Sequence, residues 1–304
     1  MNALEVYTNL YNNFYGYKWI PWWLFVPMRR LIRCLANKYL PFYLKKDYYK
    51  QSRVEQDLIV SLTSFPARIH DVWMVIETLK RQTILPEKII LWLSRKQFPS
   101  KDYIPQDLWD EEDDLFQICM VDDDIRSHKK YYYVMKEYPE KTIITCDDDI
   151  FYHPKMLEEL LQTSRLFKGC VIANVCKQLS YGSDGKLLPY LQWNNKIRSH
   201  SSKDLVQIGI GGVLYPPHSL DEKVLDKDLF LLLAPLADDL WLNFMTRKRG
   251  TLVVKSKFKY LPLPILSDAP TLTSINCGRN KNDEQISAIC AYFRNKEIKK
   301  YHMA

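Results

Sequence analysis

The sequence predicts an α/β fold in which a mostly parallel β-sheet is flanked by helices. From Leu58 onward, short apolar runs typical of strands alternate with segments whose apolar residues recur at helical spacing. The chain has 304 residues, 47% of them apolar, which is enough to build a large core. Because no internal repeat or low-complexity linker interrupts it, we expect one domain over residues 54–304 that follows an N-terminal arm over residues 1–53.

The expected strands and helices follow one another as βαβ units. The first strand covers residues 58–65, and the apolar face of the helix after it is formed by Val72, Val75, Ile76 and Leu79. Further strands are expected at residues 88–94, 115–121, 142–146 and 170–174, and further helices at residues 129–138 and after Pro154. A strand-like segment with several glycines then covers residues 207–217, followed by helices near 229–233 and 237–245 and a strand at 251–255.

The basic residues that give the chain its net charge are concentrated in the arm. The formal charge of the whole chain is +7, and residues 1–53 alone hold nine Lys and Arg against two acidic residues. The remainder is therefore neutral overall, which argues against nucleic acid as a partner.

A helix with one apolar face is expected in the arm after Pro27. The face consists of Met28, Leu31, Ile32, Leu35, Ala36 and Tyr39, and the opposite side carries Arg29, Arg30, Arg33 and Lys38. Such a helix lies on an anionic membrane surface or packs on the body of the protein, and the sequence leaves both open. The apolar stretch at residues 20–28 is too short to span a bilayer and does not look like a secretory signal. We therefore expect a cytoplasmic protein, peripheral to the inner face of the membrane if the helix binds lipid.

Three adjacent aspartates, Asp147, Asp148 and Asp149, directly follow the expected strand at residues 142–146. In parallel α/β sheets, ligands bind at the carboxyl ends of the strands. The three carboxylates repel one another, and a divalent cation would relieve that repulsion. Because oxygen ligands suit Mn²⁺ or Mg²⁺, the sequence predicts a site for one of these metals. A solvated acidic turn is the alternative.

A second acidic pair, Asp238 and Asp239, opens the apolar helix near residues 237–245. One of the two carboxylates could simply cap the helix. In the other interpretation the pair is catalytic, because a positioned carboxylate can activate a hydroxyl nucleophile.

Seven further residues are candidate nucleotide contacts. Two lie at the end of the first strand and in the next turn, three are cations around the start of a helix, and two are glycines: Thr63, Arg68, Arg126, Lys129, Lys130, Gly211 and Gly212. Loops after strands commonly bind ligands, cations at a helix N-terminus can meet a diphosphate, and glycines permit close approach to the backbone. A solvated helix face and a bulge in a strand are the alternatives for the cations and the glycines.

Six segments resemble, in this order, bacterial polysaccharide glycosyltransferases of GT-A type, with the motif order of family 2-like and exostosin-like enzymes. They are LIVSLTSFPARI, PEKIILWLS, DDIRSHKKYYY, IITCDDDI, GGVLYPP and ADDLWLNFM, and the resemblance covers roughly residues 57–290. It implies a GT-A fold, which is Rossmann-like.

The resemblance also implies roles for individual residues. Asp147 and Asp149 match the positions of a DxD motif, with Asp149 the direct metal ligand and Asp147 near the metal or the ribose. Asp148 belongs to the same nucleotide site. Asp239, or else Asp238, matches the carboxylate that faces the acceptor. A third metal ligand near the C-terminus is not evident.

The function expected from this resemblance is metal-dependent transfer of a sugar from a nucleotide diphosphate sugar, with UDP as the expected nucleotide. The acceptor would be a hydroxyl of a growing cell-surface glycan such as capsule or lipopolysaccharide, and the basic arm suggests a lipid-linked one. Stereochemistry stays open. One alternative is a sugar nucleotidyltransferase, which pyrophosphate release would identify, although no basic glycine-rich segment follows the first strand. The other is a non-catalytic scaffold of a glycan assembly complex.

Overall fold

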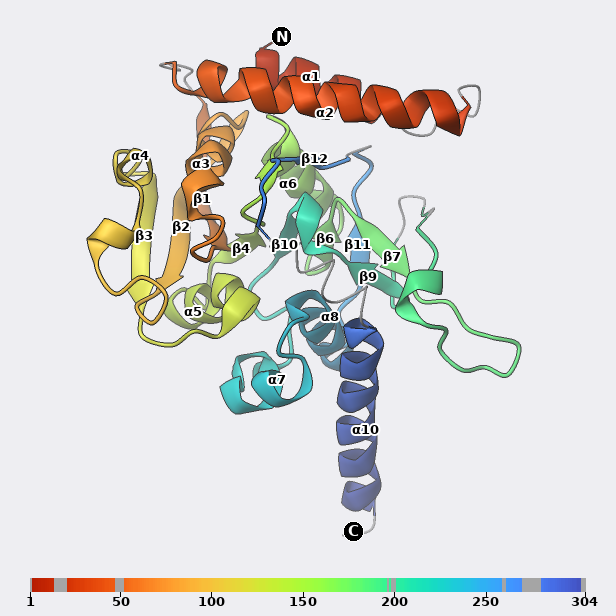
Figure 1. Cartoon of the computed structure of the whole chain (residues 1–304). Coiled ribbons are helices and arrows are strands. Elements are labelled where there is room, and N and C mark those ends of the chain that lie inside the picture. The colour runs from red at the N-terminus through yellow and green to blue at the C-terminus, as the bar shows by residue number, and fades with distance from the viewer. Residues whose placement is uncertain are drawn as a thin grey trace.

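The structure is a computed structural model that describes residues 2–13, 21–46, 52–195, 197, 201–258, 261–269 and 280–301. Among these residues, an eight-stranded sheet of order β3-β2-β1-β4-β10-β6-β11-β8 forms the centre of the fold (Figure 1). Its strands are β1 (Arg53–Thr63), β2 (Ile84–Ser94), β3 (Phe116–Val121), β4 (Thr142–Thr145), β6 (Val171–Ala173), β8 (Ser201–Ser202), β10 (Val213–Tyr215) and β11 (Val253–Lys255). β3, β2, β1 and β4 run parallel, and β10 is antiparallel to both of its neighbours. The predicted α/β fold with a mostly parallel, Rossmann-like sheet is confirmed.

Helices pack on both faces of this sheet. The described helices that follow β1 are α3 (Val72–Lys80), α4 (Gln106–Trp109), α5 (Lys129–Glu137), α6 (Met156–Leu166), α7 (Lys227–Leu233), α8 (Asp238–Arg249) and α10 (Lys281–Tyr301), of which α4 contacts α3 and α10 contacts α7 and α8. Leu58, Val60 and Leu62 of β1 join the core that contains α3 and α6, whereas Ile59 joins Val134 of α5 in another cluster. Because both faces are buried, the parallel strands are continuous apolar runs in the sequence.

The prediction of one strand-like segment over residues 207–217 is wrong in part. β9 (Leu205–Gln207), which pairs with β7 (Cys176–Gln178), ends there, and a 3₁₀ turn follows over Gly209–Gly211. The strand β10 begins only after Gly212, whose φ of +82° reverses the chain. A smaller two-stranded sheet pairs β5 (Ile150–Phe151) with β12 (Leu263–Pro264).

Two helices, α1 (Ala3–Asn13) and α2 (Trp22–Leu44), lie side by side across one edge of the molecule (Figure 1). The sequence patterns do not predict α1. One face of α2 is buried in the main core through Ile32, Ala36, Leu40 and Leu44, so the helix packs on the body of the protein, and its opposite face stays exposed. The division into an arm and a domain at residue 53 stays a prediction.

No helix in the described part of the chain is by itself long and apolar enough to cross a membrane. The helices α7 and α8 meet that test only as a pair joined across a bend of 118°.

Candidate active site

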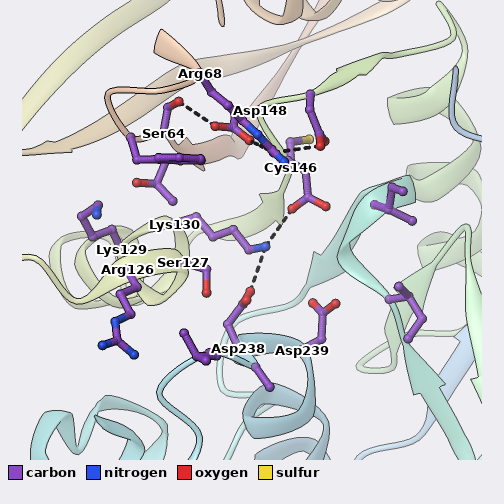
Figure 2. A pocket seen from close by; sticks show the side chains of 18 of the residues that line it. Ser64, Arg68, Arg126, Ser127, Lys129, Lys130, Cys146, Asp148, Asp238 and Asp239 are labelled. Carbon is purple, nitrogen blue, oxygen red and sulfur yellow. Dashed lines mark hydrogen bonds and ion pairs between the residues drawn. The ribbon is translucent and has the colours of Figure 1, made fainter. Parts of the chain in front are cut away.

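A cavity of about 480 Å³ lies where β1 and β4 end and where α5 and α8 begin (Figure 2). Most of the predicted site residues line it: Thr63, Arg68, Arg126, Lys129, Lys130, Asp147, Asp148, Asp149, Asp238 and Asp239. The topology explains this convergence, because β1 and β4 are parallel neighbours and their carboxyl ends meet at one edge of the sheet.

Lys130 joins the two acidic segments. Its side chain is 6% exposed, and its Nζ lies 2.9 Å from Oδ1 of Asp147 and 2.8 Å from Oδ2 of Asp238. Burial by itself lowers the pKa of the Lys130 ammonium, but the surrounding carboxylates, Asp147 first among them, raise it well above its ordinary value. Burial raises and Lys130 lowers the pKa of Asp238, and the net shift is downward. Asp238 is therefore an ionised partner of Lys130, and its side chain does not cap α8, whose N-cap is Ala237.

Arg68 is fixed by the other two aspartates of the first acidic segment. Its Nη1 lies 2.8 Å from Oδ1 of Asp148 and 2.8 Å from Oδ2 of Asp149. The hydroxyl of Ser64 also donates to Asp148, at 2.6 Å. Asp148 is buried, and burial raises its pKa against the influence of Arg68. Asp148 thus holds Arg68 against the cavity wall.

The cavity contains more negative charge than its contacting cations neutralise. Seven charged residues that line the cavity are in mutual contact or close to one another, and we name them the Lys130 cluster: Arg68, Lys130, Asp147, Asp148, Asp149, Asp238 and Asp239. Burial, and then repulsion from Asp147, raises the pKa of Asp149 to about 7. Burial, and then repulsion from Asp238, raises the pKa of Asp239 to about 7. Carboxylates whose pKa is raised by like charges are stabilised in their ionised form by an added cation.

A divalent cation fits this surplus of carboxylates. Within the residues described above, no three His, Cys, Asp or Glu side chains form a group that could hold a metal alone. Mg²⁺, however, is commonly held by one or two carboxylates together with the phosphates of a substrate. The predicted ligands Asp149 and Asp147 keep 26% and 29% of their side-chain surface exposed, so they fit such a site.

The remaining predicted cations have different surroundings. Arg126 is exposed and has a φ of +57°, so its backbone is in the left-handed region at the edge of the cavity. Lys129 is buried, and its Nζ lies 2.7 Å from Oδ1 of Asp124, which neutralises its charge. Between them, His128 is buried with Nε2 2.8 Å from the carbonyl oxygen of Ala234, and burial lowers its pKa to about 4. Within this segment, Lys129 and Lys130 are already paired with carboxylates, so Arg126 is the cation placed to offer charge to a ligand.

The predicted glycines Gly211 and Gly212 are not among the residues that line the cavity. A Cβ on either would collide with side chains packed against the sheet, which is the physical reason for glycine there. Gly209 does not line the cavity either, but it contacts Asp239, which does. Its N–H donates to Oδ2 of Asp239 at 3.0 Å, and a Cβ there would lie 2.9 Å from Oδ1 of the same residue. The sequence could not separate Gly209 from its neighbours, because all three glycines belong to one run.

The cavity also has an apolar lining, which the sequence did not predict. It includes Tyr190, Ile208, Ile210, Leu236 and Leu240. No local signal marks such residues, because an apolar residue that lines a cavity looks like a core residue in the sequence. A cavity with both apolar and charged lining suits a ligand with a planar ring and phosphates.

Comparison with known proteins shows a likeness in fold only. No family model and no curated protein matches the chain. Among solved structures, an apo UDP-glucose pyrophosphorylase has 9% identity and a TM-score of 0.42, over 81% of this chain and 100% of that chain. A 4-diphosphocytidyl-2C-methyl-D-erythritol synthase from Anaerococcus prevotii has 12% identity and a TM-score of 0.41, over 69% and 90%. A CMP:2-keto-3-deoxy-manno-octonic acid synthetase complexed with CTP has 13% identity and a TM-score of 0.39, over 67% and 89%.

These similar structures are nucleotidyltransferases, so the comparison contradicts the prediction of a glycosyltransferase and does not confirm the GT-A family. It agrees better with the alternative, a sugar nucleotidyltransferase. At such identities and TM-scores the likeness extends to the fold and no further. The function is therefore argued from the site.

Proposed function

We propose that the chain is a metal-dependent sugar nucleotidyltransferase. In this reaction an oxygen of a sugar phosphate forms a bond to the α-phosphorus of a nucleoside triphosphate. The bond from that phosphorus to the bridging oxygen of the β-phosphate breaks, and pyrophosphate leaves with the electron pair. The observation that carries the proposal is the surplus of carboxylates around Lys130 at the ends of β1 and β4, in a cavity that also has an apolar lining.

The surplus of carboxylates suits a polyphosphate that arrives with a divalent cation. A triphosphate alone would be repelled by the Lys130 cluster, whereas its complex with Mg²⁺ or Mn²⁺ brings the missing positive charge. Asp149 and Asp147 are the residues that would hold the cation. When bound, it neutralises charge on the phosphates and stabilises the leaving pyrophosphate. Arg68 and Arg126, on the cavity wall, are placed to contact phosphate oxygens.

The attacking group in this reaction needs no general base. A phosphate monoester has a second pKa of about 6, so its oxygens are largely ionised at neutral pH. The protein must therefore supply positive charge and position. Lys130 provides a charge that its two ion pairs hold in place. Asp239, fixed by the N–H of Gly209, is placed to accept hydrogen bonds from sugar hydroxyls.

The nucleoside would lie against the apolar lining, to which Leu240 and Ile210 belong. Thr63, at the end of β1, also lines the cavity. The Thr63 hydroxyl already donates to the carbonyl of Trp92 at 2.8 Å, so its free lone pairs can only accept a hydrogen bond. This arrangement is compatible with UTP or with another nucleoside triphosphate.

The test is pyrophosphate release by the full-length protein. Nucleoside triphosphates are paired in turn with sugar 1-phosphates and Mg²⁺ or Mn²⁺, and pyrophosphate is measured with a coupled pyrophosphatase. We expect release that requires both substrates and is stopped by a chelator. The temperature of thermal unfolding should rise when the triphosphate is added, and only when the metal is present. Absence of pyrophosphate with every pair, or turnover of a nucleotide sugar without pyrophosphate chemistry, would overturn the proposal.

A further inference from the structure

A row of exposed apolar side chains runs along α2, on the side away from the core. We name it the α2 stripe, and it consists of Leu24, Met28, Leu31, Leu35, Tyr39 and Phe42. At about 100° per residue, these six positions lie within about 80° of one another around the helix. Leu31 is 57% exposed and Phe42 is 72% exposed. A continuous apolar row on the surface marks an interaction site, whereas scattered apolar residues do not.

The stripe faces away from the core, because the opposite side of α2 packs on the rest of the protein. Ile32 and Ala36 are buried in the main core. Between them and the C-terminal end of the helix, Nδ2 of Asn37 donates to the carbonyl of Pro264 at 3.0 Å. Oδ1 of Asn37 accepts from the N–H of Leu266 at 2.7 Å.

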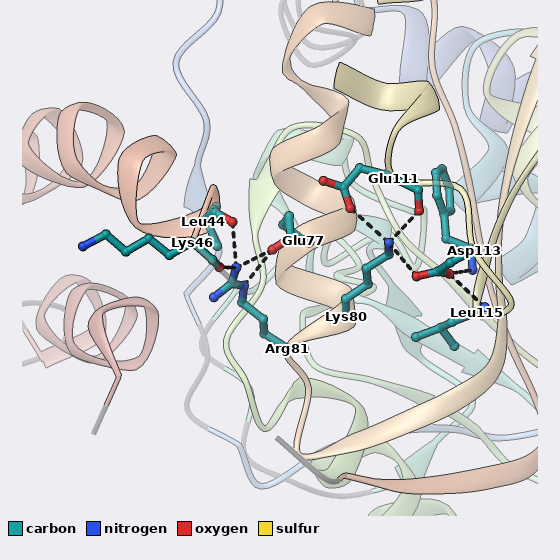
Figure 3. A network of polar contacts seen from close by, with 9 residues as sticks. Leu44, Lys46, Glu77, Lys80, Arg81, Glu111, Asp113 and Leu115 are labelled. Atoms are coloured by element: carbon teal, nitrogen blue, oxygen red, sulfur yellow. Dashed lines mark hydrogen bonds and ion pairs between the residues drawn. The ribbon is translucent and has the colours of Figure 1, made fainter. Parts of the chain in front are cut away.

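The C-terminal end of α2 is held by Arg81, which follows α3. Figure 3 shows Nη2 of Arg81 donating to the carbonyl oxygens of Leu44 at 2.6 Å and Lys46 at 2.8 Å. Its Nε donates to Oε2 of Glu77 at 2.9 Å, which orients the guanidinium. Carbonyls at the end of a helix have no partner within the helix, so these bonds both cap α2 and fix its rotation.

The charge around the stripe is complementary to an anionic surface. The residues Trp22–Leu44 include no Asp or Glu. Lys38 is exposed beside the stripe, and Arg30 is exposed about 100° further around the helix from the edge of the stripe. Residues 1–53 carry a charge equal to the whole +7 of the chain. The same charges oppose pairing of two copies through α2, because they would bring like charges together. Trp23, 60% exposed at the start of the helix, is a residue type enriched at bilayer interfaces.

We propose that α2 lies flat on an anionic lipid bilayer, with the stripe at the boundary of the acyl chains and Arg30 and Lys38 among the headgroups. Figure 1 shows α5 and α8, which begin at the cavity, on the far side of the molecule from α2. Docking through α2 therefore leaves the cavity in water. The proposal stands on contacts of α1, α2 and α3 and is independent of the reaction.

The stripe is tested by co-sedimentation of the full-length protein with vesicles. Mixed phosphatidylcholine and phosphatidylserine vesicles should bind it more strongly than phosphatidylcholine alone, and salt should weaken the difference. The double variant Leu31→Ser/Phe42→Ser should lose at least about tenfold in affinity, because two large apolar groups no longer leave water. The matched control is Leu166→Ser/Leu232→Ser, at residues 74% and 71% exposed on α6 and α7, and it should bind as the wild type does.

The charge requirement is tested separately with Arg30→Gln/Lys38→Gln. We expect a loss of at least about tenfold for the mixed vesicles and little change for phosphatidylcholine alone. Lys168→Gln/Lys257→Gln, at exposed lysines elsewhere, is the control with the same change of net charge.

Three outcomes would overturn the proposal. The first is a protein that stays in the supernatant with both kinds of vesicle, and the second is a stripe variant that binds as the wild type does. The third is a dimer by light scattering that Leu31→Ser/Phe42→Ser converts to a monomer without any vesicle binding, which would assign the stripe to a second copy of the chain.

Discussion

The Lys130 cluster and a second cluster, around Lys80, are each built on a lysine between carboxylates, and they differ in charge balance and in place. The Lys80 cluster consists of Lys80, Arg81, Glu77, Glu111 and Asp113 (Figure 3). Nζ of Lys80 lies 3.0 Å from Oε2 of Glu111 and 2.9 Å from Oδ2 of Asp113. Two cations there meet three carboxylates, whereas two cations meet five in the Lys130 cluster.

The difference between the clusters separates a structural role from a ligand site. The Lys80 cluster also lines a cavity, of about 540 Å³, but its side chains join α3 to the end of α2 and to the turn before β3. The Lys130 cluster has the larger surplus of carboxylates, and it lies at the carboxyl ends of parallel strands, where α/β folds bind ligands. A buried lysine between carboxylates is therefore no sign of a site by itself. The surplus of charge and the position in the fold are what indicate one.

The largest expected effect is on stability, from removing the lysine of each cluster. Lys130→Met should lower the free energy of unfolding by about 3–5 kcal/mol, because it leaves buried carboxylates without their cation. Lys80→Met should cost less than half as much, because its side chain is 16% exposed and solvent screens the charges that remain. Urea unfolding measures both. The double variant Lys130→Met/Asp238→Asn should recover part of the loss, and equal losses in the two single variants would contradict the comparison.

The next effect is on turnover, from neutralising one carboxylate in each cluster. Asp149→Asn should lower pyrophosphate release by about 100-fold or more, because one of the two carboxylates that would hold the cation is lost. Its melting temperature without metal should be unchanged or higher, since repulsion from Asp147 and Asp148 is relieved and Arg68 keeps its pair with Asp148. The matched variant Asp113→Asn should lose stability and keep its turnover. A fully active Asp149→Asn would show that the surplus charge has no part in binding metal and phosphate.

The pH dependence of stability should distinguish the clusters as well. Burial, and then repulsion from Glu77, raises the pKa of Glu111 to about 7, against an unfolded value of about 4.3. Between these two pKa values the native state holds a proton that the unfolded state has lost. The contribution of protonated Glu111 to the free energy of unfolding is therefore complete below about pH 4 and is lost as the pH rises through about 7. Glu111→Gln should therefore flatten the fall in unfolding free energy over this window. The raised pKa values of Asp149 and Asp239 add to the fall in unfolding free energy over the same pH range. Added Mg²⁺ should reduce their part of the fall and leave the part due to Glu111 unchanged. If the slope of unfolding free energy against pH is the same in Glu111→Gln as in the wild type, Glu111 is ionised throughout this range.

The smallest expected effect concerns the exposed cation at the edge of the cavity. Arg126→Gln should raise the KM for the nucleoside triphosphate about tenfold with little change in kcat, because it removes a charged hydrogen bond to substrate. Arg95→Gln is the control, since Arg95 is exposed and pairs with Asp122, and neither residue lines the cavity. Steady-state kinetics measure both variants, and equal KM values in the two would remove Arg126 from the site.

Local patterns in the sequence were sufficient for the parallel part of the fold. Continuous apolar runs marked β1, β2 and β4, and the acidic residues Asp147 and Asp149 after β4 marked the edge where the cavity lies. In the arm, such patterns were not sufficient. Its predicted apolar face is divided by the structure, with Ile32 and Ala36 in the core and Leu31 exposed. Both groups are apolar, so periodicity alone could not tell a core contact from a surface.

The arrangement inside the cavity depended on contacts between distant segments. Lys130 looked like a solvated helix residue until α8 placed Asp238 beside it, more than a hundred residues further along the chain. Gly209 was one of several glycines until the turn before β10 brought it to Asp239. The partners of a buried charge follow from tertiary packing, which no local spacing encodes.

The measurement that tests the central claim most directly is exchange of labelled pyrophosphate. In the reverse reaction, an oxygen of pyrophosphate forms a bond to the phosphorus that carries the nucleoside, and the sugar phosphate leaves. With Mg²⁺, a panel of nucleotide sugars and labelled pyrophosphate, the wild type should form labelled nucleoside triphosphate. Asp113→Asn should do so equally, and Asp149→Asn should not. Absence of labelled triphosphate with every nucleotide sugar, from a folded protein in saturating metal, would contradict the assignment of this cavity to nucleotidyl transfer.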